Sequence, residues 1–306
     1  MPPDRPPIPA NNVFAGAYVD RRADARIAAD WAAAARRDPE AIYLLMRGTE
    51  ALMRIDAAGQ PVAVQLLPAS DARVRVADEA GLTLLGWFGG ARCLLANVTE
   101  AASPVGAGEA FLELRPFAGR LPEREAGLVA YARALSVWRA NHRYCGRCGQ
   151  PMRPARAGHQ LECVACGNQS FPRIDPAIIV LVTESQRALL GRQPGWPPGR
   201  YSTIAGFVEP GEALEDAVSR EVLEETGIEV VGSRYHSSQP WPFPSSLMLG
   251  FEASSPGGEP RADDSELEDV RWFTRAQVRS GEILLPPGES ISRRLIEGWL
   301  NGADVG

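Results

Sequence analysis

The sequence of 306 residues has no apolar run approaching the roughly 20 residues that a membrane-spanning helix needs. Its first ten residues, MPPDRPPIPA, contain prolines but no apolar stretch, which is unlike a secretory signal. Basic residues are not in excess either. With 32 Lys and Arg against 38 Asp and Glu, the net charge of −6 argues against a dedicated binder of polyanions. We therefore expect a cytoplasmic protein that does not contact membranes.

Cysteine and histidine are also scarce. Four of the five cysteines fall between residues 145 and 166, which is typical of a metal site in a reducing compartment rather than of a disulfide framework. Cys93 stands apart in the run CLLANV, and we expect it to be a buried thiol. The three histidines, His142, His159 and His236, lack metal-ligand spacing, so we expect structural roles for them.

Composition and length indicate a globular protein of about two domains. No internal repeat is apparent. We predict a disordered leader over residues 1–12, a strand-rich domain over 13–120, a linker helix and a four-cysteine module over 121–171, and an α+β domain over 172–306. The first domain contains an Ala/Arg-rich helix candidate at about 21–36. In the last domain, AIIVLVT at 177–183 predicts a buried strand, and the final helix is expected near 290–300.

Two CxxCG units form the four-cysteine module. Two residues between thiolates allow one tight turn to direct both sulfurs at one ion, and the following glycine permits that turn. Two such turns predict a closed tetrahedral Zn²⁺ site with a structural role. The alternative is a nucleic-acid-binding ribbon that uses the nearby Arg147, Arg153 and Arg156. The predicted ligands are Cys145, Cys148, Cys163 and Cys166.

A second helix is predicted over residues 213–226 and ends at Gly227. At about 100° per residue, Glu221 and Glu225 point into the same face as the apolar residues. The opposite, solvent-facing side is predicted to carry Glu212, Asp216 and Ser219. The apolar face comprises Leu214, Ala217, Val218 and Val222.

Carboxylates on a packed face repel each other and lose hydration, at a cost of several kcal/mol unless cations neutralise them. An acidic helix is more commonly a solvated face, but the directions of Glu221 and Glu225 contradict that interpretation. Hard oxygen ligands suit Mg²⁺ or Mn²⁺. Glu224 lies beside them and within reach of Arg220, which we expect to orient it.

The segment SQPWPFPSS, residues 238–246, is too rich in proline for a central strand. Its prolines are expected to hold the backbone extended and to present Gln239, Trp241 and Phe243. From composition alone, a binding segment and a rigid structural loop are equally good interpretations.

Residues 206–228 match, at every fixed position, the Nudix box GX₅EX₇REUXEEXGU, in which U is apolar. The chain thus resembles the Nudix hydrolases, which implies an α/β/α sandwich with a mixed sheet for residues 172–306. It also implies metal-dependent hydrolysis of a nucleoside diphosphate linked to another group. The family's catalytic and metal-binding glutamates correspond to Glu221, Glu224 and Glu225, with the Ala205 carbonyl as a further ligand. The residues leave open which glutamate is the general base.

The order of ribbon, box and SQPWPFPxS segment resembles the NADH pyrophosphatase subfamily, some of whose members remove NAD caps from RNA. This resemblance implies NADH or NAD⁺ as substrate, a homodimer, and a metal ligand at Glu266. Rival substrates on the same helix are ADP-ribose, diadenosine polyphosphates or a coenzyme. The implied substrate contacts are Phe171, Phe207, Gln239, Pro240, Trp241, Pro242, Phe243, Pro244, Ser245, Ser246 and Ser292.

Overall fold

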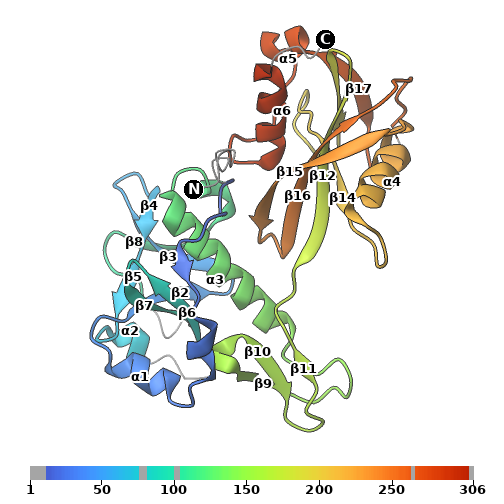
Figure 1. Ribbon diagram of the computed structural model, residues 1–306. Helices are drawn as coiled ribbons and strands as arrows, with labels where there is room; N and C mark the ends of the chain where they lie inside the picture. Colours follow the sequence, from blue (N-terminus) through green and yellow to red (C-terminus); the bar gives the residue numbers. More distant parts are fainter. Residues whose placement is uncertain (1–11, 76–80, 100–103, 263–265, 303–306) are drawn as a thin grey trace, which may run out of the picture. The chain divides into compact units, whose positions relative to one another are not determined.

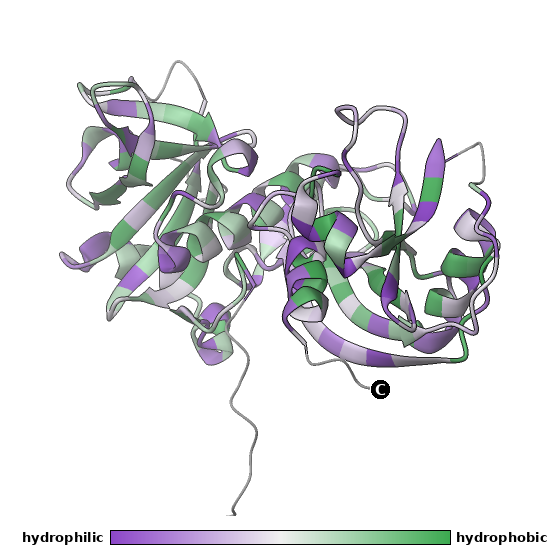
Figure 2. Ribbon diagram, turned by 90° about the horizontal axis from the view of Figure 1, so that it is seen from above, coloured by the Kyte–Doolittle hydropathy of each residue, from purple (hydrophilic) through white to green (hydrophobic). Residues whose placement is uncertain are grey.

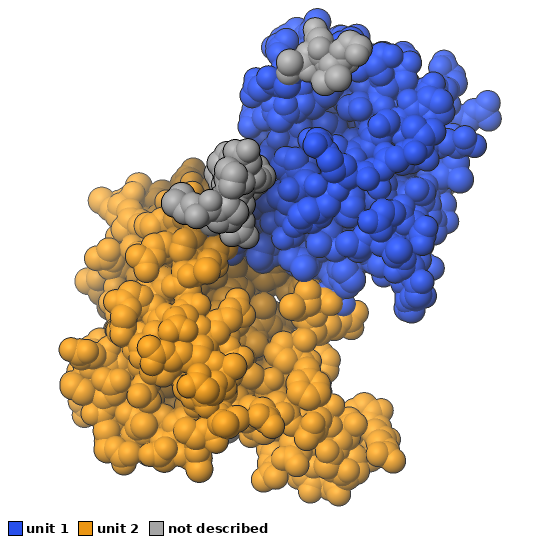
Figure 3. Space-filling view, viewed as in Figure 1, with its two compact units in different colours: residues 1–15, 175–240, 246–306 blue, residues 16–174, 241–245 orange. Residues whose placement is uncertain are grey.

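The computed structural model describes residues 12–75, 81–99, 104–262 and 266–302. They form two compact units (Figure 3). One contains residues 12–15, Asp175–Pro240 and the chain from Ser246; the other contains Gly16–Ile174 and Trp241–Ser245. Of the predicted leader, only Asn12 lies within the described residues, and its buried amide donates to the Ser238 carbonyl at 2.8 Å. Across the described parts of the chain, no helix is long and apolar enough to span a membrane.

The C-terminal unit is built on one mixed sheet (Figure 1). Its strands lie in the order β15-β16-β12-β13-β17, with β14 paired to β12. β12 and β16 are parallel, whereas β12 pairs with β13 and with β14 in antiparallel fashion. The elements are β12 (Asp175–Glu184), β13 (Arg187–Arg192), β14 (Ile204–Phe207), α4 (Leu214–Thr226), β15 (Gly232–Trp241), β16 (Ser246–Ser254), β17 (Asp269–Thr274), α5 (Arg275–Ser280) and α6 (Ile291–Asn301).

Alternating side chains of β12 serve two separate cores. Ile178, Val180 and Val182 pack in one cluster with Ala217, Val218 and Val222 of α4. Ile179 and Leu181 pack on the opposite face with Leu295 and Ile296 of α6. Because successive residues of a strand point to opposite faces, a continuous apolar run satisfies both layers. Figure 2 shows hydrophobic and hydrophilic residues mixed along the strands and helices. The expected α/β/α sandwich is confirmed.

The N-terminal region is strand-rich, as predicted. The predicted single helix at 21–36 was wrong, because the backbone is extended at Ala28 and separates η1 from α1. This break allows both Ala25 and Trp31 to pack against the core of the sheet. The elements are β1 (Val19–Asp20), η1 (Ala23–Ile27), α1 (Trp31–Arg37), β2 (Ile42–Arg47), β3 (Glu50–Ile55), β4 (Pro61–Val64), β5 (Leu66–Pro68), α2 (Ala72–Arg75), β6 (Leu82–Phe88), β7 (Ala91–Asn97), β8 (Glu109–Glu113) and η4 (Arg115–Phe117).

The two large sheets share an arrangement of six strands, to which the N-terminal sheet adds β1 and β4. The sequence did not reveal this repeat. β7 is parallel to β2 as β16 is to β12, β5 pairs with β2 as β14 does with β12, and β8 pairs with β3 as β17 does with β13. At the place of α4, the described part of the N-terminal unit contains α2, a four-residue helix of sequence ARVR. These described residues carry no carboxylate, unlike α4.

The predicted linker helix is α3 (Glu123–Asn141), which follows Pro122 and buries Leu128, Ala132, Leu135 and Trp138. It leads into a small antiparallel sheet in the order β11-β10-β9. The elements of this ribbon are β9 (Met152–Ala155), η5 (Arg156–Gly158), β10 (Gln160–Cys163) and β11 (Gln169–Ser170).

Candidate active site

Helix α4 places two carboxylates on its packed face, as predicted. Gly227 ends the helix in the left-handed conformation, with φ of 68°. Glu221 is 9% exposed and Glu225 is 5% exposed, although both belong to a residue type that is rarely buried. Glu224 lies on the exposed side. The helix thus carries two desolvated carboxylates and one that water can reach.

Gly206 provides the space for one of these carboxylates. β14 lies antiparallel to β12, with Gly206 opposite Ile178, and α4 packs over this strand. A methyl group on Gly206 would overlap the carboxylate carbon and both carboxylate oxygens of Glu221. The glycine is therefore required for close approach and not for a special backbone angle.

Burial raises the pKa of Glu221, while the adjacent Arg220 guanidinium opposes that rise. The neighbouring Glu224 and Glu266 carboxylates raise the pKa of Glu221 further. A buried acid surrounded by other acids favours a bound cation, since a positive charge restores the ionised form.

Arg220 links the loop before α4 to the carboxylates on the helix. Its guanidinium donates to both carboxylate oxygens of Glu212, at 2.5 and 2.8 Å, and to the Phe207 carbonyl at 3.0 Å. It also forms ion pairs with Glu221 at 2.9 Å and Glu224 at 3.0 Å. This confirms that Arg220 orients Glu224.

The predicted solvent-facing position of Glu212 was wrong. The helix begins at Leu214, so Glu212 lies in the preceding turn, where no helical direction applies, and folds back onto Arg220. This bidentate bond lowers the pKa of Glu212 to about 2. The Nudix box fixes the spacing between Glu212 and Arg220, and this spacing could have indicated the pair. Helical geometry alone could not, because Glu212 precedes the helix.

The two remaining predicted metal ligands lie outside helix α4. Ala205 lies in β14, opposite Ile179 of β12, and Glu266 is exposed just before β17. Within the described ranges, the glutamates do not form a closed cluster: the one set of at least three His, Cys, Asp or Glu ligand atoms within 4.8 Å of one another is made of cysteines. An open carboxylate set fits Mg²⁺ or Mn²⁺, which keep positions for water and substrate phosphates.

The four predicted cysteine ligands converge. Sulfur–sulfur distances are 3.4 Å for Cys148–Cys163 and Cys148–Cys166 and 3.7 Å for Cys145–Cys166. A tetrahedral zinc–thiolate site requires about 3.8 Å between sulfurs. Backbone N–H groups also donate to Cys145 Sγ and Cys163 Sγ, which favours the thiolate form. The residues fit a structural Zn²⁺ ion, and this closed tetrad leaves no position for a substrate.

The segment 238–246 is not extended throughout, contrary to the prediction. β15 and β16 are neighbours in the sheet, with β15 at its edge, and residues 242–245 form the turn between them. Prolines lack the N–H that continued strand pairing needs, so the run PFPS closes a hairpin instead. Trp241 and Phe243 contact each other edge to face, with ring centroids 5.1 Å apart.

The predicted substrate contacts fall into exposed and buried groups. Phe171 and Phe207 are each 60% exposed. Gln239 is 1% exposed, and its amide bonds to the carbonyls of Val13 and Glu289 and to the N–H of Ile291. Ser292 is also buried and accepts hydrogen bonds from Thr203. The side chains of Gln239 and Ser292 are thus bonded to protein groups in this structure.

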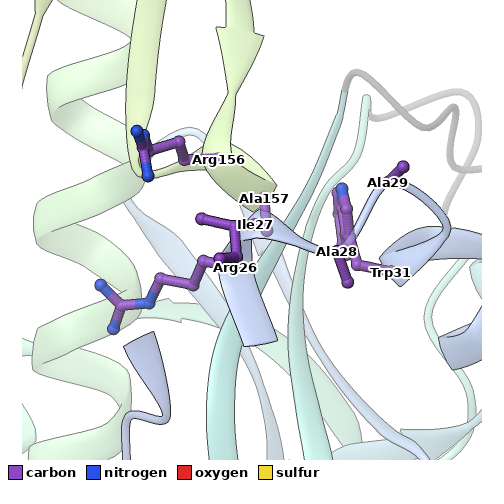
Figure 4. A pocket seen from close by; sticks show the side chains of 7 residues that line it. All are labelled: Arg26, Ile27, Ala28, Ala29, Trp31, Arg156 and Ala157. Carbon is purple, nitrogen blue, oxygen red and sulfur yellow. The ribbon is translucent and has the colours of Figure 1, made fainter. Parts of the chain in front are cut away.

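A separate hollow in the N-terminal unit contains none of the predicted site residues (Figure 4). Arg26 and Arg156 extend to one side of it and Trp31 stands at the other. Its lining contains no carboxylate, so it offers no ligands to a hard cation. Its lining residues are Arg26, Ile27, Ala28, Ala29, Trp31, Arg156 and Ala157.

Comparisons with known proteins agree with this geometry. Residues 173–298 match the NUDIX domain, residues 140–171 the NADH pyrophosphatase zinc ribbon domain, and residues 40–138 the NADH pyrophosphatase-like rudimentary NUDIX domain. The chain is a Nudix hydrolase. The rudimentary domain contains the sheet that repeats the Nudix strand arrangement.

More particularly, the chain belongs to the zinc-ribbon-containing NADH pyrophosphatase family. It is 38% identical over 293 residues to the NAD-capped RNA hydrolase NudC of Mycobacterium bovis, covering 90% of this chain and 93% of that protein. It is 44% identical over 217 residues to NudC of Stutzerimonas stutzeri, covering 71% and 76%. Human NAD-capped RNA hydrolase NUDT12 is 40% identical over 198 residues, covering 59% of this chain and 43% of the human protein.

Proposed function

We propose that the protein hydrolyses the pyrophosphate bond of NAD(H), releasing nicotinamide mononucleotide, reduced when NADH is the substrate, and AMP. We extend the proposal to NAD caps at RNA 5′ ends. The observation that carries it is the pair of buried carboxylates, Glu221 and Glu225, on the Nudix helix of a chain that belongs to the NADH pyrophosphatase family.

The catalytic Mg²⁺ or Mn²⁺ is proposed to be held by residues of β14, α4 and the loop before β17. When bound, such ions neutralise the charge of the phosphates and lower the pKa of a bound water. Arg220 holds Glu221 and Glu224 at fixed positions through its ion pairs. Glu224 is the exposed carboxylate of the three and can accept a proton from water. The proposed ligands are the Ala205 carbonyl, Glu221, Glu224, Glu225 and Glu266.

Selectivity for the nicotinamide half is proposed to rest mainly on aromatic side chains outside the Nudix box. The exposed ring of Phe171, and that of Phe207 within the box, offer stacking surfaces to a base or a nicotinamide ring. Trp241 and Phe243 are held at the β15–β16 turn and present a second aromatic pair. Gln239 and Ser292 would support this site through the backbone that they fix.

We further propose a cytoplasmic homodimer with one structural Zn²⁺ per chain. Free cysteines poised as four ligands suit a reducing compartment. Exposed apolar side chains of the ribbon and the residues after it suit burial against a second copy. They are Tyr144, Val164, Phe171 and Ile174. Light scattering coupled to size exclusion measures the mass, which for a dimer is twice the 33.0 kDa of one chain.

Parallel assays test the activity. The protein is incubated with Mg²⁺ or Mn²⁺ and with NADH, NAD⁺, ADP-ribose or an NAD-capped RNA, and the products are identified by mass spectrometry. We expect NADH to yield reduced nicotinamide mononucleotide and AMP. Cleavage of ADP-ribose well above that of NADH would overturn the assignment of substrate.

A matched pair of variants tests the metal assignment. Glu225→Gln removes a buried carboxylate charge from α4 and is expected to lower kcat/KM by at least about 100-fold. Glu215→Gln changes an exposed glutamate in the first turn of the same helix and should remain active. Full activity of Glu225→Gln would refute the role of this glutamate.

A further inference from the structure

The turn after Trp241 is held by two arginines of the N-terminal unit. Arg133 of α3 donates a hydrogen bond from its guanidinium to the Pro242 carbonyl and lies over the Phe243 ring, 4.8 Å from its centroid. Arg115 approaches the rings of Trp241 and Phe243 at 5.8 and 5.9 Å. These contacts, all within one compact unit, place the aromatic pair between two cationic groups.

Two residues of the turn lack a backbone donor. Pro242 and Pro244 have no N–H, and the Phe243 N–H bonds locally to the Trp241 carbonyl at 2.8 Å. Before the turn, the chain is fixed in the C-terminal unit by the three hydrogen bonds of Gln239. Beyond Pro240, Arg133 contacts both the backbone of the turn and its Phe243 ring.

Burying the charged side chain of Arg133 costs free energy that a purely structural position does not require. It is 8% exposed, and its Nε atom is buried without a hydrogen-bond partner among the described residues. Its nearest acid, Glu113, is 3.6 Å away and partly exposed. Burial lowers the pKa of Arg133, which reflects the cost of desolvating its charge. An apolar side chain of similar length would fill the same space without that cost.

We infer that Arg133 of the N-terminal unit is a positioning residue that fixes the turn 241–245. By fixing this turn, it sets selectivity for substrates that contain nicotinamide. The inference rests on the proposed function for the identity of the substrate, but the fixing of the turn does not. Helix α3 suits this task because its buried face anchors it to the N-terminal sheet, where Ser136 bonds to the Gly48 carbonyl at 3.0 Å.

Hydrogen exchange tests the positioning without any substrate. In Arg133→Met, the amides of Trp241, Phe243 and Ser245 are expected to exchange at least about tenfold faster than in the wild type, since the hydrogen bond and the ring contact are lost. The melting temperature should stay within a few degrees, because a buried charge is replaced by an apolar group. Unchanged exchange in this turn would overturn the inference.

Arg139→Met is the matched control. Arg139 lies on the same helix and donates to the Leu82 carbonyl and to Thr83 Oγ1, away from the turn. It should leave exchange at residues 241–245 unchanged. Arg133→Lys, which keeps the charge but not the planar group, should restore part of the protection. In a Phe243→Leu background, Arg133→Met should raise the exchange rate by a smaller factor than in the wild type, because the ring contact is already lost and only the hydrogen bond to the Pro242 carbonyl remains to be removed.

Kinetics with two substrates test the consequence for selectivity. In Arg133→Met, KM for NADH is expected to rise on the order of tenfold, with kcat changed much less and with ADP-ribose kinetics unchanged. Equal losses on both substrates would indicate a purely structural role and overturn the selectivity claim. If the wild type fails to cleave NADH, the proposed function fails, while the exchange data still decide whether Arg133 fixes the turn.

Discussion

Gly206 lies against the carboxylate of Glu221 with no room for even one methyl group between them. The strand that carries the glycine pairs with β12, and the helix that carries the glutamate packs on the same sheet. Gly206, the first residue of the Nudix box, thus leaves space for the carboxylate of Glu221, which lies near the end of the box. This explains in steric terms why a glycine stands fifteen positions ahead of Glu221, a proposed metal ligand.

Gly206→Ala is therefore expected to displace the Glu221 carboxylate. We expect kcat/KM to fall about 100-fold, which is about 3 kcal/mol, together with weaker Mn²⁺ binding by electron paramagnetic resonance. Overpacking should also lower the unfolding free energy by about 1–3 kcal/mol.

Gly232→Ala is the matched control for this change. A Cβ at Gly232 meets nothing within 4 Å, and its backbone is not in the left-handed region. This variant should retain near wild-type activity. Activity of Gly206→Ala within twofold of the wild type would show that the carboxylate does not need its present position.

Arg220→Lys is expected to lower kcat/KM on the order of tenfold or more. A lysine ammonium cannot hold both oxygens of Glu212 and reach Glu221 and Glu224 at once, as the guanidinium does. Steady-state kinetics with Mg²⁺ would measure the loss. For comparison, Arg293→Lys alters an exposed pair with Glu297 on α6 and should have little effect. Comparable kinetics for the two variants would contradict a special role for Arg220.

The sequence predicted the site helix well because its evidence was local. The directions of Glu221 and Glu225 follow from helical geometry alone, and both are buried. The Arg220–Glu224 pair followed from the same spacing. Glu212 was misplaced because it precedes the helix, where the backbone direction depends on a turn that periodicity does not describe.

Features that depend on contacts between distant segments were beyond the sequence. The duplicated sheet was hidden because strand pairing, and not residue identity, is what repeats. The contact of Arg133 with Pro242 joins residues far apart in the chain, and nothing in the composition of either segment indicates it. The turn at 242–245 was predicted as extended because proline rigidity was considered without the edge position of β15.

From the four-cysteine site we expect one zinc ion per chain. Elemental mass spectrometry of the purified protein measures this metal content. Cys148→Ser should lose this zinc and expose residues 143–171 to limited proteolysis, because metal binding and local folding are coupled. Cys93→Ala is the control: this thiol is fully buried, and burial raises its pKa to about 12, so it is inert toward metals. It should keep one zinc per chain. Retention of zinc by Cys148→Ser would refute the tetrad.

His159 predicts how stability depends on pH. It is partly buried and hydrogen-bonded through Nε2 to the Leu84 carbonyl at 2.7 Å, and burial lowers its pKa from 6.5 to about 4. As the pH falls from 6.5 to 4, the unfolded chain binds a proton that the folded chain does not. The contribution of neutral His159 is therefore complete above pH 6.5 and is lost below it, by at most about 1.4 kcal/mol per pH unit.

His159→Gln keeps a donor for the Leu84 carbonyl but cannot titrate. Urea unfolding of both proteins should give a constant difference in unfolding free energy above pH 7. Below pH 6.5, the wild type should lose stability relative to the variant, because its unfolded state alone gains the proton. If the difference in unfolding free energy stays constant down to pH 4.5, folded His159 titrates like an exposed histidine. Burial would then not lower its pKa, and this prediction would be wrong.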